Sequence, residues 1–587
     1  MEKLAALRTL MEAHGLDAYI ISSGDAHNND RMADYWRVRS WFSGFTGSAG
    51  TVVVTPTEAG LWTDGRYFIQ AEEELAGTSI DLYKMGEPGV PTYEEFLLEK
   101  LPEGGKLGFD GRTMSAAGFD LLKKKLEQKK LTYCYQEDWV GTLWANRPSL
   151  PHLPVFEHLP QFAGLSAAEK LRTVREKMKE NGVTAYLVSA LDDIAWLLNI
   201  RGQDVSNTPV AYAYVLITEK DAYVFIDFRK VQDISGKLMS QGFTLDTYGA
   251  VVHRLKALTG GNIYYNCNRT NVLLSEGAIP GALERVNTRD IIAFLKGIKS
   301  EAELANIRNA YIKEGVAMTK LLKWLDDSIS AGNVLTEDDV AKKLQGFRKQ
   351  QAHYLCDSFD TISAYGANAA QVHYHHKGTG AALEPKGFFL LDTGGQYLDG
   401  TTDTTRTVCL GALTDEMKRD FTLVLKGHIA LSCAVFLKGT TGRALDMLAR
   451  QPILQSCQNY NHGTGHGIGY CLGVHEGPYG INQRNDVVIE PGMVFANEPA
   501  IYKQGRYGIR TENSIVAKAL CQNDDGTFYN FETLTYCPYD TRGINVEMLT
   551  QQEKDFVSTY HAKVQQVLSP MLTEDEQAWL KIRCAKI

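Results

Sequence analysis

Phe388-Phe389-Leu390-Leu391-Asp392, followed by Gly394, Gly395 and Gly400 and then by Thr401-Thr402-Asp403-Thr404-Thr405, is the stretch of sequence that decides the fold. The first run is apolar and the second is β-branched, so both favour strands, and the glycines between them are typical of a turn. The pattern predicts a β-hairpin that carries one carboxylate on each side of its turn, where the two can face each other.

A second pair of carboxylates repeats this arrangement further along the chain. Glu498 closes an apolar run, and Glu512 follows Ile509-Arg510-Thr511, with glycines near the turn between them. Between the two pairs lies His462-Gly463-Thr464-Gly465-His466-Gly467-Ile468-Gly469, whose alternating glycines disfavour a helix. Two hairpins and a glycine-rich loop can therefore bring four carboxylates and an imidazole together.

Carboxylates that converge on one point repel one another, so they must share protons or bind cations. Four carboxylates carry four negative charges, which two divalent ions balance, so a dinuclear site is expected. Oxygen-rich ligation with a single histidine and no cysteine favours Mn²⁺, with Zn²⁺ or Co²⁺ as substitutes. Bridging carboxylates hold such ions about 3.5–4 Å apart, close enough to share a hydroxide.

Other interpretations of the same residues are weaker. A single Asp or Glu beside a glycine turn is usually turn chemistry, so the hypothesis depends on the whole set. His462 and His466 have the spacing of the zinc pair in H-E-x-x-H, but Gly463 stands where that motif needs Glu. The glycine loop does not fit G-x-G-x-x-G, which leaves a nucleotide site without support.

The N-terminal half contains a repeat. Met11–Ser22 and Met178–Ser189 both read as the end of a helix, a glycine and a strand, and Leu61–Arg66 has an echo in Val224–Arg229. We infer two domains of one α/β architecture that arose by duplication.

Domain boundaries follow from composition and from helix-start signals. Four prolines between Pro148 and Pro160 predict a stiff, extended connector. The box Ser166-Ala167-Ala168-Glu169 predicts the first helix of the second domain. The box Ser300-Glu301-Ala302-Glu303 begins a long helix, and Thr336–Asp339 begins the next. We expect α/β domains at 1–150 and 151–299 and an α+β domain at 300–587, with a helical tail from about residue 546.

Composition limits the class of protein. The chain has 587 residues, 44% of them hydrophobic and 22% charged, which is ordinary for a soluble globular protein. A net charge of −9 predicts no nucleic-acid or acidic-membrane partner. Ten scattered cysteines, an amphipathic start instead of a signal peptide, and no apolar run of membrane length lead us to expect a cytoplasmic protein.

The motifs together resemble a known family. Leu391–Tyr397, Gly400–Thr407, His462–Gly467, His475–Pro478 and Gly508–Asn513 are similar to the pita-bread metallopeptidases, specifically the long form of Xaa-Pro aminopeptidase. Trp41–Gly50, Leu61–Tyr67 and Ala195–Gly202 resemble the two creatinase-like N-terminal domains of that form. The resemblance covers nearly the whole chain. It implies two creatinase-like α/β domains, a pita-bread α+β catalytic domain and a homodimer.

The resemblance also implies residue roles. Asp392 would bind one metal through two oxygens, Asp403 and Glu512 would bridge both metals, and His466 and Glu498 would hold the second. Three histidines would surround the substrate without binding metal, namely His373, His462 and His475. Arg510 would share a strand face with Glu512 and orient the carboxylates, and Glu498 would also accept a proton.

The activity implied is release of the N-terminal residue from peptides with proline in the second position. The hypothesis is that a water activated by two cations attacks the carbonyl of the Xaa-Pro bond. One alternative is a prolidase that cuts only Xaa-Pro dipeptides, which the doubled N-terminal domains oppose. Another is a pita-bread binding module that has lost its metals, which the intact ligand set opposes.

Overall fold

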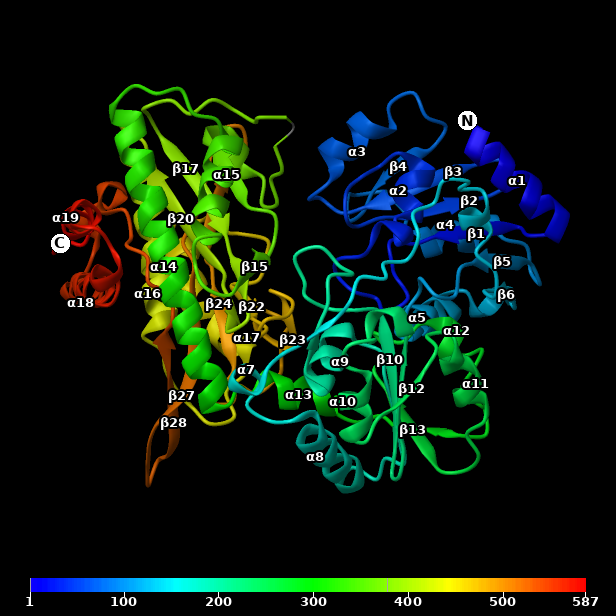
Figure 1. The fold of residues 1–587 in the computed structure, drawn as a ribbon. Coiled ribbons are helices and arrows are strands. Elements are labelled where there is room, and N and C mark those ends of the chain that lie inside the picture. The colour runs from blue at the N-terminus through cyan, green and yellow to red at the C-terminus, as the bar shows by residue number, and fades with distance from the viewer. Residues whose placement is uncertain (1, 377) are drawn as a thin grey trace. The chain divides into compact units, whose positions relative to one another are not determined.

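The computed structural model describes residues 2–376 and 378–587 (Figure 1). The chain forms two compact units. One contains Met1–Glu157, Leu165–Ser206 and Val210–Ile292, and the other contains His158–Gly164, Asn207–Pro209 and Ala293–Ile587.

The first unit contains two six-stranded sheets of the same design. In the first sheet the strand order is β4-β3-β2-β1-β5-β6, and β1 pairs antiparallel with β2 and parallel with β5. Its strands are β1 (Ala18–Ile21), β2 (Thr51–Val54), β3 (Ala59–Thr63), β4 (Asp81–Lys84), β5 (Lys106–Phe109) and β6 (Thr132–Cys134). Its helices are α1 (Glu2–His14), α2 (Val38–Ser43), α3 (Phe68–Leu75), α4 (Tyr93–Lys100), α5 (Ala116–Lys125) and α6 (Trp139–Thr142).

The second sheet repeats this topology. Its order is β12-β11-β10-β8-β13-β14, and β8 pairs antiparallel with β10 and parallel with β13. The strands are β8 (Ala185–Val188), β10 (Ala213–Thr218), β11 (Ala222–Ile226), β12 (Thr244–Asp246), β13 (Asn262–Tyr265) and β14 (Glu284–Arg285). The helices are α8 (Ala167–Glu180), α9 (Leu191–Leu198), α10 (Ser235–Ser240), α11 (Ala250–Lys256) and α12 (Val272–Ser275). The predicted repeat of one α/β architecture is confirmed.

The proline-rich connector is shorter than predicted. Residues 148–155 form neither helix nor strand, and β7 (Phe156–Glu157) pairs with β9 (Ile200–Arg201). Pro160 does not continue the extended segment but occupies the first turn of α7 (Pro160–Ala163). Proline is accepted there because its missing N–H would have no partner within the helix.

The second unit is built around one long helix. After α13 (Ile291–Gly297), α14 (Glu301–Ser330) begins at the predicted capping box of Ser300 and Glu303, and α15 (Glu337–Arg348) begins at a box of Thr336 and Asp339. In Figure 1, α14 is the long helix that crosses the second unit. Apolar side chains of its C-terminal half, from Ala317 to Leu325, belong to one hydrophobic cluster with Phe389 and Leu391 of β17.

The strands of this unit form three layers, in which neighbouring strands pair antiparallel, and one hairpin. Their orders are β15-β18-β19, β16-β17-β20, β21-β28-β27-β24-β22-β23 and β25-β26. The first two layers consist of β15 (Tyr354–Asp357), β16 (Ile362–Tyr365), β17 (Phe388–Thr393), β18 (Gly395–Tyr397), β19 (Gly400–Thr401) and β20 (Thr404–Cys409). The others consist of β21 (Val435–Leu437), β22 (Gly465–Gly467), β23 (Glu476–Ile481), β24 (Val494–Asn497), β25 (Ala500–Lys503), β26 (Tyr507–Arg510), β27 (Asn513–Asn523) and β28 (Gly526–Thr533). Further helices are η4 (Gly366–Ala370), α16 (Asp415–Ser432) and α17 (Gly442–Leu454).

The C-terminal tail packs against the rest of the second unit, as its amphipathic pattern predicts. Val557, Val564 and Leu568 of α18 (Gln551–Leu568) are buried in the main hydrophobic cluster. Trp579 of α19 (Glu574–Arg583) donates a 2.8 Å hydrogen bond to Asp326 of α14.

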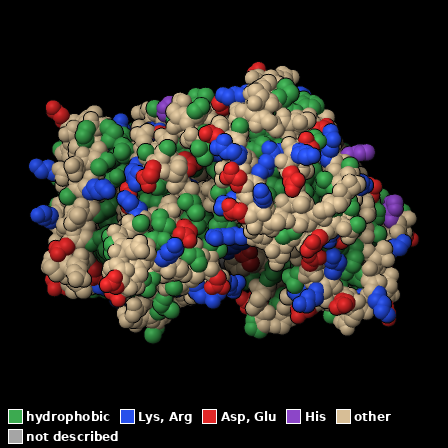
Figure 2. All heavy atoms as spheres, turned by 90° about the horizontal axis from the view of Figure 1, so that it is seen from below, with side chains coloured by type: hydrophobic (Ala, Val, Ile, Leu, Met, Phe, Trp, Pro, Cys, Tyr) green, Lys and Arg blue, Asp and Glu red, His purple; other side chains and the backbone are tan. Residues whose placement is uncertain are grey.

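Acidic and basic side chains are interspersed on the face drawn in Figure 2, so the net charge is not gathered into one patch there. All ten cysteines lie in the described residues, and none of them forms a disulfide. Among those residues we find no helix with the length and apolarity needed to span a bilayer.

Close approach of α14 to the hairpin depends on Gly400. A Cβ at this position would lie 2.8 Å from the Cβ of Ala310 and 3.4 Å from the Cα of Ile307. Gly400→Ala should therefore destabilise the second unit by about 1–3 kcal/mol, because an added methyl has no room in a packed interface. Thermal unfolding followed by circular dichroism measures the effect.

Gly346→Ala is the matched control for this substitution. Gly346 is an exposed residue of α15, and nothing lies within 4 Å of an added Cβ. The same methyl should stabilise the protein there by about 1 kcal/mol, because alanine favours a helix more than glycine does. Equal midpoints for the two variants would contradict the steric argument.

Candidate metal centre

The first carboxylate pair lies on the predicted hairpin. Asp392 is in β17, which pairs antiparallel with β20 so that Asp392 faces Thr405. The prediction that Asp403 lies within a strand is wrong, because Asp403 lies in the break between β19 and β20. The chain passes there from one three-stranded sheet to the next, which frees the Asp403 side chain from the alternation of a strand.

The second pair is placed in the same manner. Glu498 directly follows β24, and Glu512 lies in the break between β26 and β27. The backbone N–H of Glu512 donates to the carbonyl of Thr405, 3.1 Å away. This bond joins the second break to the strand that follows the first, so Asp403 and Glu512 are brought together.

Three of the predicted ligands come within contact distance of one another. One ligand atom from each of Asp403, His466 and Glu512 lies within 4.8 Å of the other two. His466, on β22, has Nε2 3.4 Å from Asp403 Oδ2 and 3.8 Å from Glu498 Oε1. Asp392 is near enough for its charge to raise the pKa of both Asp403 and Glu512. All five predicted ligands therefore converge.

Burial and mutual repulsion oppose ionisation of the carboxyl groups in this cluster. Burial, followed by neighbouring carboxylates, raises the pKa of Asp403 and of Glu512 above its ordinary value. Burial and then the charge of Glu512 raise the pKa of Glu498 to about 8. Without cations, Glu498 therefore holds its proton at neutral pH.

The carboxylate oxygens fit a metal site. Asp392 Oδ2 accepts from Arg510, 2.6 Å away, and Glu512 Oε2 accepts from Thr405 Oγ1, 2.8 Å away. The other oxygens, Asp392 Oδ1 and Glu512 Oε1, are buried and have no hydrogen-bond partner. Buried polar atoms are rarely left without partners, so these two are suited to bind cations.

The orientation of His466 also fits a ligand. Its Nδ1 lies 2.8 Å from the carbonyl oxygen of Gly467, an acceptor, so Nδ1 carries the proton. Nε2 then presents its lone pair to Asp403 and Glu498. A backbone carbonyl that fixes the ring in this manner is typical of metal-binding histidines.

Arg510 lies next to a different carboxylate from the one predicted. The family resemblance implied that Arg510 shares a strand face with Glu512. Strand β26 ends at Arg510, however, so the alternation of side chains does not continue to Glu512. Its buried guanidinium instead donates to Asp392 and, over 2.5 Å, to the hydroxyl of Tyr502. Arg510 thereby fixes one oxygen of Asp392.

His462 is outside the ligand cluster, in agreement with the rejection of a zincin motif. Its Nδ1 donates to the carbonyl of Gly463 over 2.7 Å, and its Nε2 lies 2.9 Å from the Tyr502 hydroxyl. Burial, followed by the charge of Arg510, lowers its pKa to about 3. His462 is therefore neutral, and Tyr502 links it to Arg510.

The other two histidines lie beside the centre and are exposed. The ring centroid of His475 is 4.3 Å from that of His466, with the rings nearly perpendicular. His373 is near enough to His462 for its charge to lower the pKa of that imidazole. Arg510 also donates to the carbonyl of Val372, 3.5 Å away. Both histidines are thus accessible from solvent.

Several residues around the centre escaped the sequence analysis. Thr405 and Arg406 lie in the hairpin motif, where Arg406 donates to the carbonyl of Glu512 over 2.6 Å. Tyr502 and Tyr311, which touch Arg510 and the backbone of Asp403, lie in no motif. In the sequence, the only feature that could have indicated such supporting residues was the repetition of threonine in the hairpin motif.

Comparison with protein families places these residues in a known class. Residues 3–137 and residues 146–303 each match a family described as the creatinase/prolidase N-terminal domain. Residues 305–519 match metallopeptidase family M24, and residues 527–587 match the C-terminal region of that family. The converging carboxylates all lie within the M24 match, so fold and site define a metallopeptidase of this class.

Individual relatives narrow the class. The chain is 38% identical over 604 residues to a probable Xaa-Pro aminopeptidase P of Laccaria bicolor, with 100% of this chain and 93% of the relative covered. It superposes on an X-prolyl aminopeptidase of Caenorhabditis elegans with a TM-score of 0.94, at 33% identity, over 100% of this chain and 99% of that one. That relative is described as a cytosolic enzyme with a di-nuclear active site. The chain belongs to the Xaa-Pro aminopeptidase P family.

A dipeptidase is less similar. The Xaa-Pro dipeptidase of Bacillus anthracis superposes with a TM-score of 0.52 at 26% identity, and 99% of that enzyme covers 64% of this chain. About a third of this chain therefore has no counterpart in the dipeptidase.

The raised pKa of Glu498 predicts a pH effect on the metal-free protein. Between its ordinary value of 4.5 and about 8, Glu498 is protonated in the folded chain and ionised in the unfolded chain. The contribution of this group to the free energy of unfolding therefore falls as pH rises, by about 1.4 kcal/mol per pH unit. Glu498→Gln should remove this contribution.

Urea unfolding of the two chelated proteins between pH 5 and 8 tests this effect. The buried histidines contribute equally to both proteins, so the difference between the slopes reports the loss of the Glu498 carboxyl and of its effect on the pKa of Asp403. Parallel stability curves would show that the carboxyl titrates normally.

Proposed function

We propose that this chain is a metal-dependent aminopeptidase that releases the N-terminal residue from peptides with proline in the second position. The observation that carries the proposal is the meeting of Asp392, Asp403, His466, Glu498 and Glu512, with two buried carboxylate oxygens left without partners. Membership of the Xaa-Pro aminopeptidase P family supports the substrate class.

The residues divide into holders of metal and groups that act beside it. Asp392, Asp403, His466, Glu498 and Glu512 would hold two divalent ions, with Asp403 and Glu512 shared between them. When bound, the ions supply water activation near neutral pH and electrostatic stabilisation of charge that develops on the carbonyl oxygen. Arg510 orients Asp392 through its 2.6 Å contact.

Proton transfer is assigned to Glu498 and the histidines. Glu498 lies at the edge of the cluster, partly accessible, and its carboxylate accepts the proton of the attacking water. The exposed rings of His373 and His475 stabilise the tetrahedral oxygen or return a proton to the departing proline nitrogen. His462, neutral and bonded to Tyr502, orients Arg510 and binds substrate on that side.

The bond before proline suits this arrangement. It has no N–H, so a peptidase that recognises the extended backbone through that group binds it poorly. A site that acts on the carbonyl avoids the limitation. The free α-amine of the substrate is placed near the carboxylates, which makes the enzyme an exopeptidase.

Metal identity, compartment and assembly belong to the same proposal. Oxygen-rich ligands with one imidazole favour Mn²⁺, with Zn²⁺ or Co²⁺ as substitutes. A cytoplasmic location agrees with the description of the C. elegans relative as cytosolic. A homodimer is expected from the family resemblance, and light scattering after size-exclusion chromatography measures it.

Hydrolysis of short peptides separates the aminopeptidase from a prolidase. Chelated protein should be inactive, and Mn²⁺ should restore cleavage of an Xaa-Pro-Xaa tripeptide to the free amino acid and a Pro-Xaa dipeptide. Activity confined to Xaa-Pro dipeptides would favour the prolidase. Failure of the metal-restored enzyme on every such peptide would leave only the binding-module alternative.

Asp403→Ala tests the ligand set. This variant loses a buried carboxylate of the cluster, so it should bind fewer than two equivalents of Mn²⁺. Its kcat/KM should fall at least about 100-fold, because metal ions contribute several kcal/mol of transition-state stabilisation. Elemental analysis and tripeptide hydrolysis measure both effects. Asp524→Ala, at an exposed position of the same unit, is the control and should leave both unchanged. Full turnover in the Asp403 variant would refute the assignment.

A further inference from the structure

One helix contacts both Asp403 and the residue directly before it. Tyr311 of α14 has its hydroxyl 3.2 Å from the Asp403 N–H, from which it accepts, and it donates to Ser514 of β27. Three residues along the same helix, Glu314 reaches Thr402, the residue directly before Asp403. Residues three apart lie on one face of a helix, so this face of α14 holds the break that carries the ligand.

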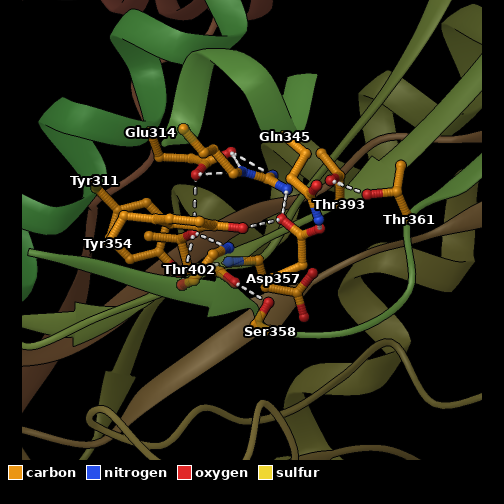
Figure 3. A network of polar contacts seen from close by, with 12 residues as sticks. Tyr311, Glu314, Gln345, Tyr354, Asp357, Ser358, Thr361, Thr393 and Thr402 are labelled. Atoms are coloured by element: carbon orange, nitrogen blue, oxygen red, sulfur yellow. Dashed lines mark hydrogen bonds and ion pairs between the residues drawn. The ribbon is translucent and has the colours of Figure 1, made fainter. Parts of the chain in front are cut away.

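Glu314 joins the two sides of the hairpin through a single oxygen. Its Oε2 accepts from the Thr402 hydroxyl, 3.2 Å away, and from the Tyr397 hydroxyl on β18, 3.0 Å away. Figure 3 shows Glu314 and Tyr311 reaching toward Thr402 from the helix. Thr402 is bonded further, since its hydroxyl accepts from the Gly395 N–H and its carbonyl from Ser358.

Glu314 itself is held by Arg348 of α15. Arg348 donates to both oxygens of Glu314, over 2.6 Å to Oε1 and 3.1 Å to Oε2, and both side chains are buried. Its remaining nitrogen donates over 2.8 Å to Asp357, which also accepts from Tyr354 and Gln345 (Figure 3). A two-bond pair between planar groups has one geometry, so Glu314 has little freedom to move.

The same helix also holds the tip of the hairpin. Asp399, in the turn between β18 and β19, is buried and accepts from Asn309 and from Lys313, each over 2.5 Å. Together with the Gly400 contact on Ala310, these bonds make α14 a rigid support for the hairpin from its turn to Asp403.

We propose that Glu314, held by Arg348, is a positioning residue that sets the metal affinity of the centre by fixing Thr402 and hence Asp403. The inference rests on the proposed function, because it assigns Asp403 to the metals. A ligand must be held within about 0.5 Å of its place to keep its coordination. Substitution of the partners that orient metal ligands costs about 10- to 100-fold in affinity.

The experiment removes one hydroxyl at a time, because substitution of Glu314 or Arg348 would leave a buried charge without its partner. Tyr397→Phe removes a donor to Glu314 at the hairpin. Tyr354→Phe is the matched control, since it removes a phenol that donates to Asp357 at the far end of Arg348. Calorimetric titration of the chelated proteins with Mn²⁺ measures affinity and stoichiometry, and the unfolding midpoint of each metal-free protein is measured beside it.

We expect Tyr397→Phe to weaken Mn²⁺ binding about 10-fold. We expect Tyr354→Phe to bind within twofold of the wild type, with a similar change of unfolding midpoint. Thr402→Val removes the second hydroxyl on Glu314 without changing side-chain size and should weaken binding as Tyr397→Phe does. The visible spectrum of the Co²⁺-loaded proteins should change in the two hairpin variants and not in the control.

The outcomes distinguish the role of Glu314 from the proposed function itself. Wild-type affinity in both hairpin variants, or equal losses in Tyr397→Phe and Tyr354→Phe, would overturn the role of Glu314. Failure of the wild-type chain itself to bind two equivalents of Mn²⁺ would instead overturn the proposed function.

Discussion

Repulsion among buried carboxylates is the constraint on which the rest of the catalytic unit depends. Asp403 and Glu512 are almost fully buried, with Asp392 close by, and each raises the cost of ionising another. Chain segments with like charges would separate if they were free to do so. The fold must therefore bring together groups that oppose being together, and cations relieve that opposition.

The structure meets this constraint by placing the ligands where strands end. Asp403 and Glu512 lie in breaks between sheets, and Glu498 lies directly after a strand, so backbone pairing on either side fixes them. Hydrogen bonds then occupy one oxygen of each of two carboxylates. Asp392 Oδ2 accepts from Arg510, and Glu512 Oε2 accepts from Thr405. The oxygens that remain, Asp392 Oδ1 and Glu512 Oε1, have no hydrogen-bond partner, so the ligand capacity of the centre follows from the hydrogen bonds around it.

Histidines near one another in the structure have different roles because their surroundings differ. His466 donates from Nδ1 to a backbone carbonyl and presents Nε2 to carboxylates. His462, four residues earlier, is bonded to Tyr502 and is kept neutral by burial and by Arg510. The spacing of two histidines therefore says little about their function when the segment between them is not a helix.

The sequence by itself determined the residue types that meet at the centre, the repeated α/β architecture, and the helix starts at Ser166, Ser300 and Thr336. These features follow from local chemistry: carboxylates demand charge balance, and capping boxes use neighbouring residues. Only the tertiary structure decided that Asp403 lies outside a strand, that Arg510 contacts Asp392, and that Glu314 and Arg348 support the hairpin. Such contacts join residues separated by 34 to 118 positions, and an ordinary buried ion pair leaves no periodic pattern by which its partner could be recognised.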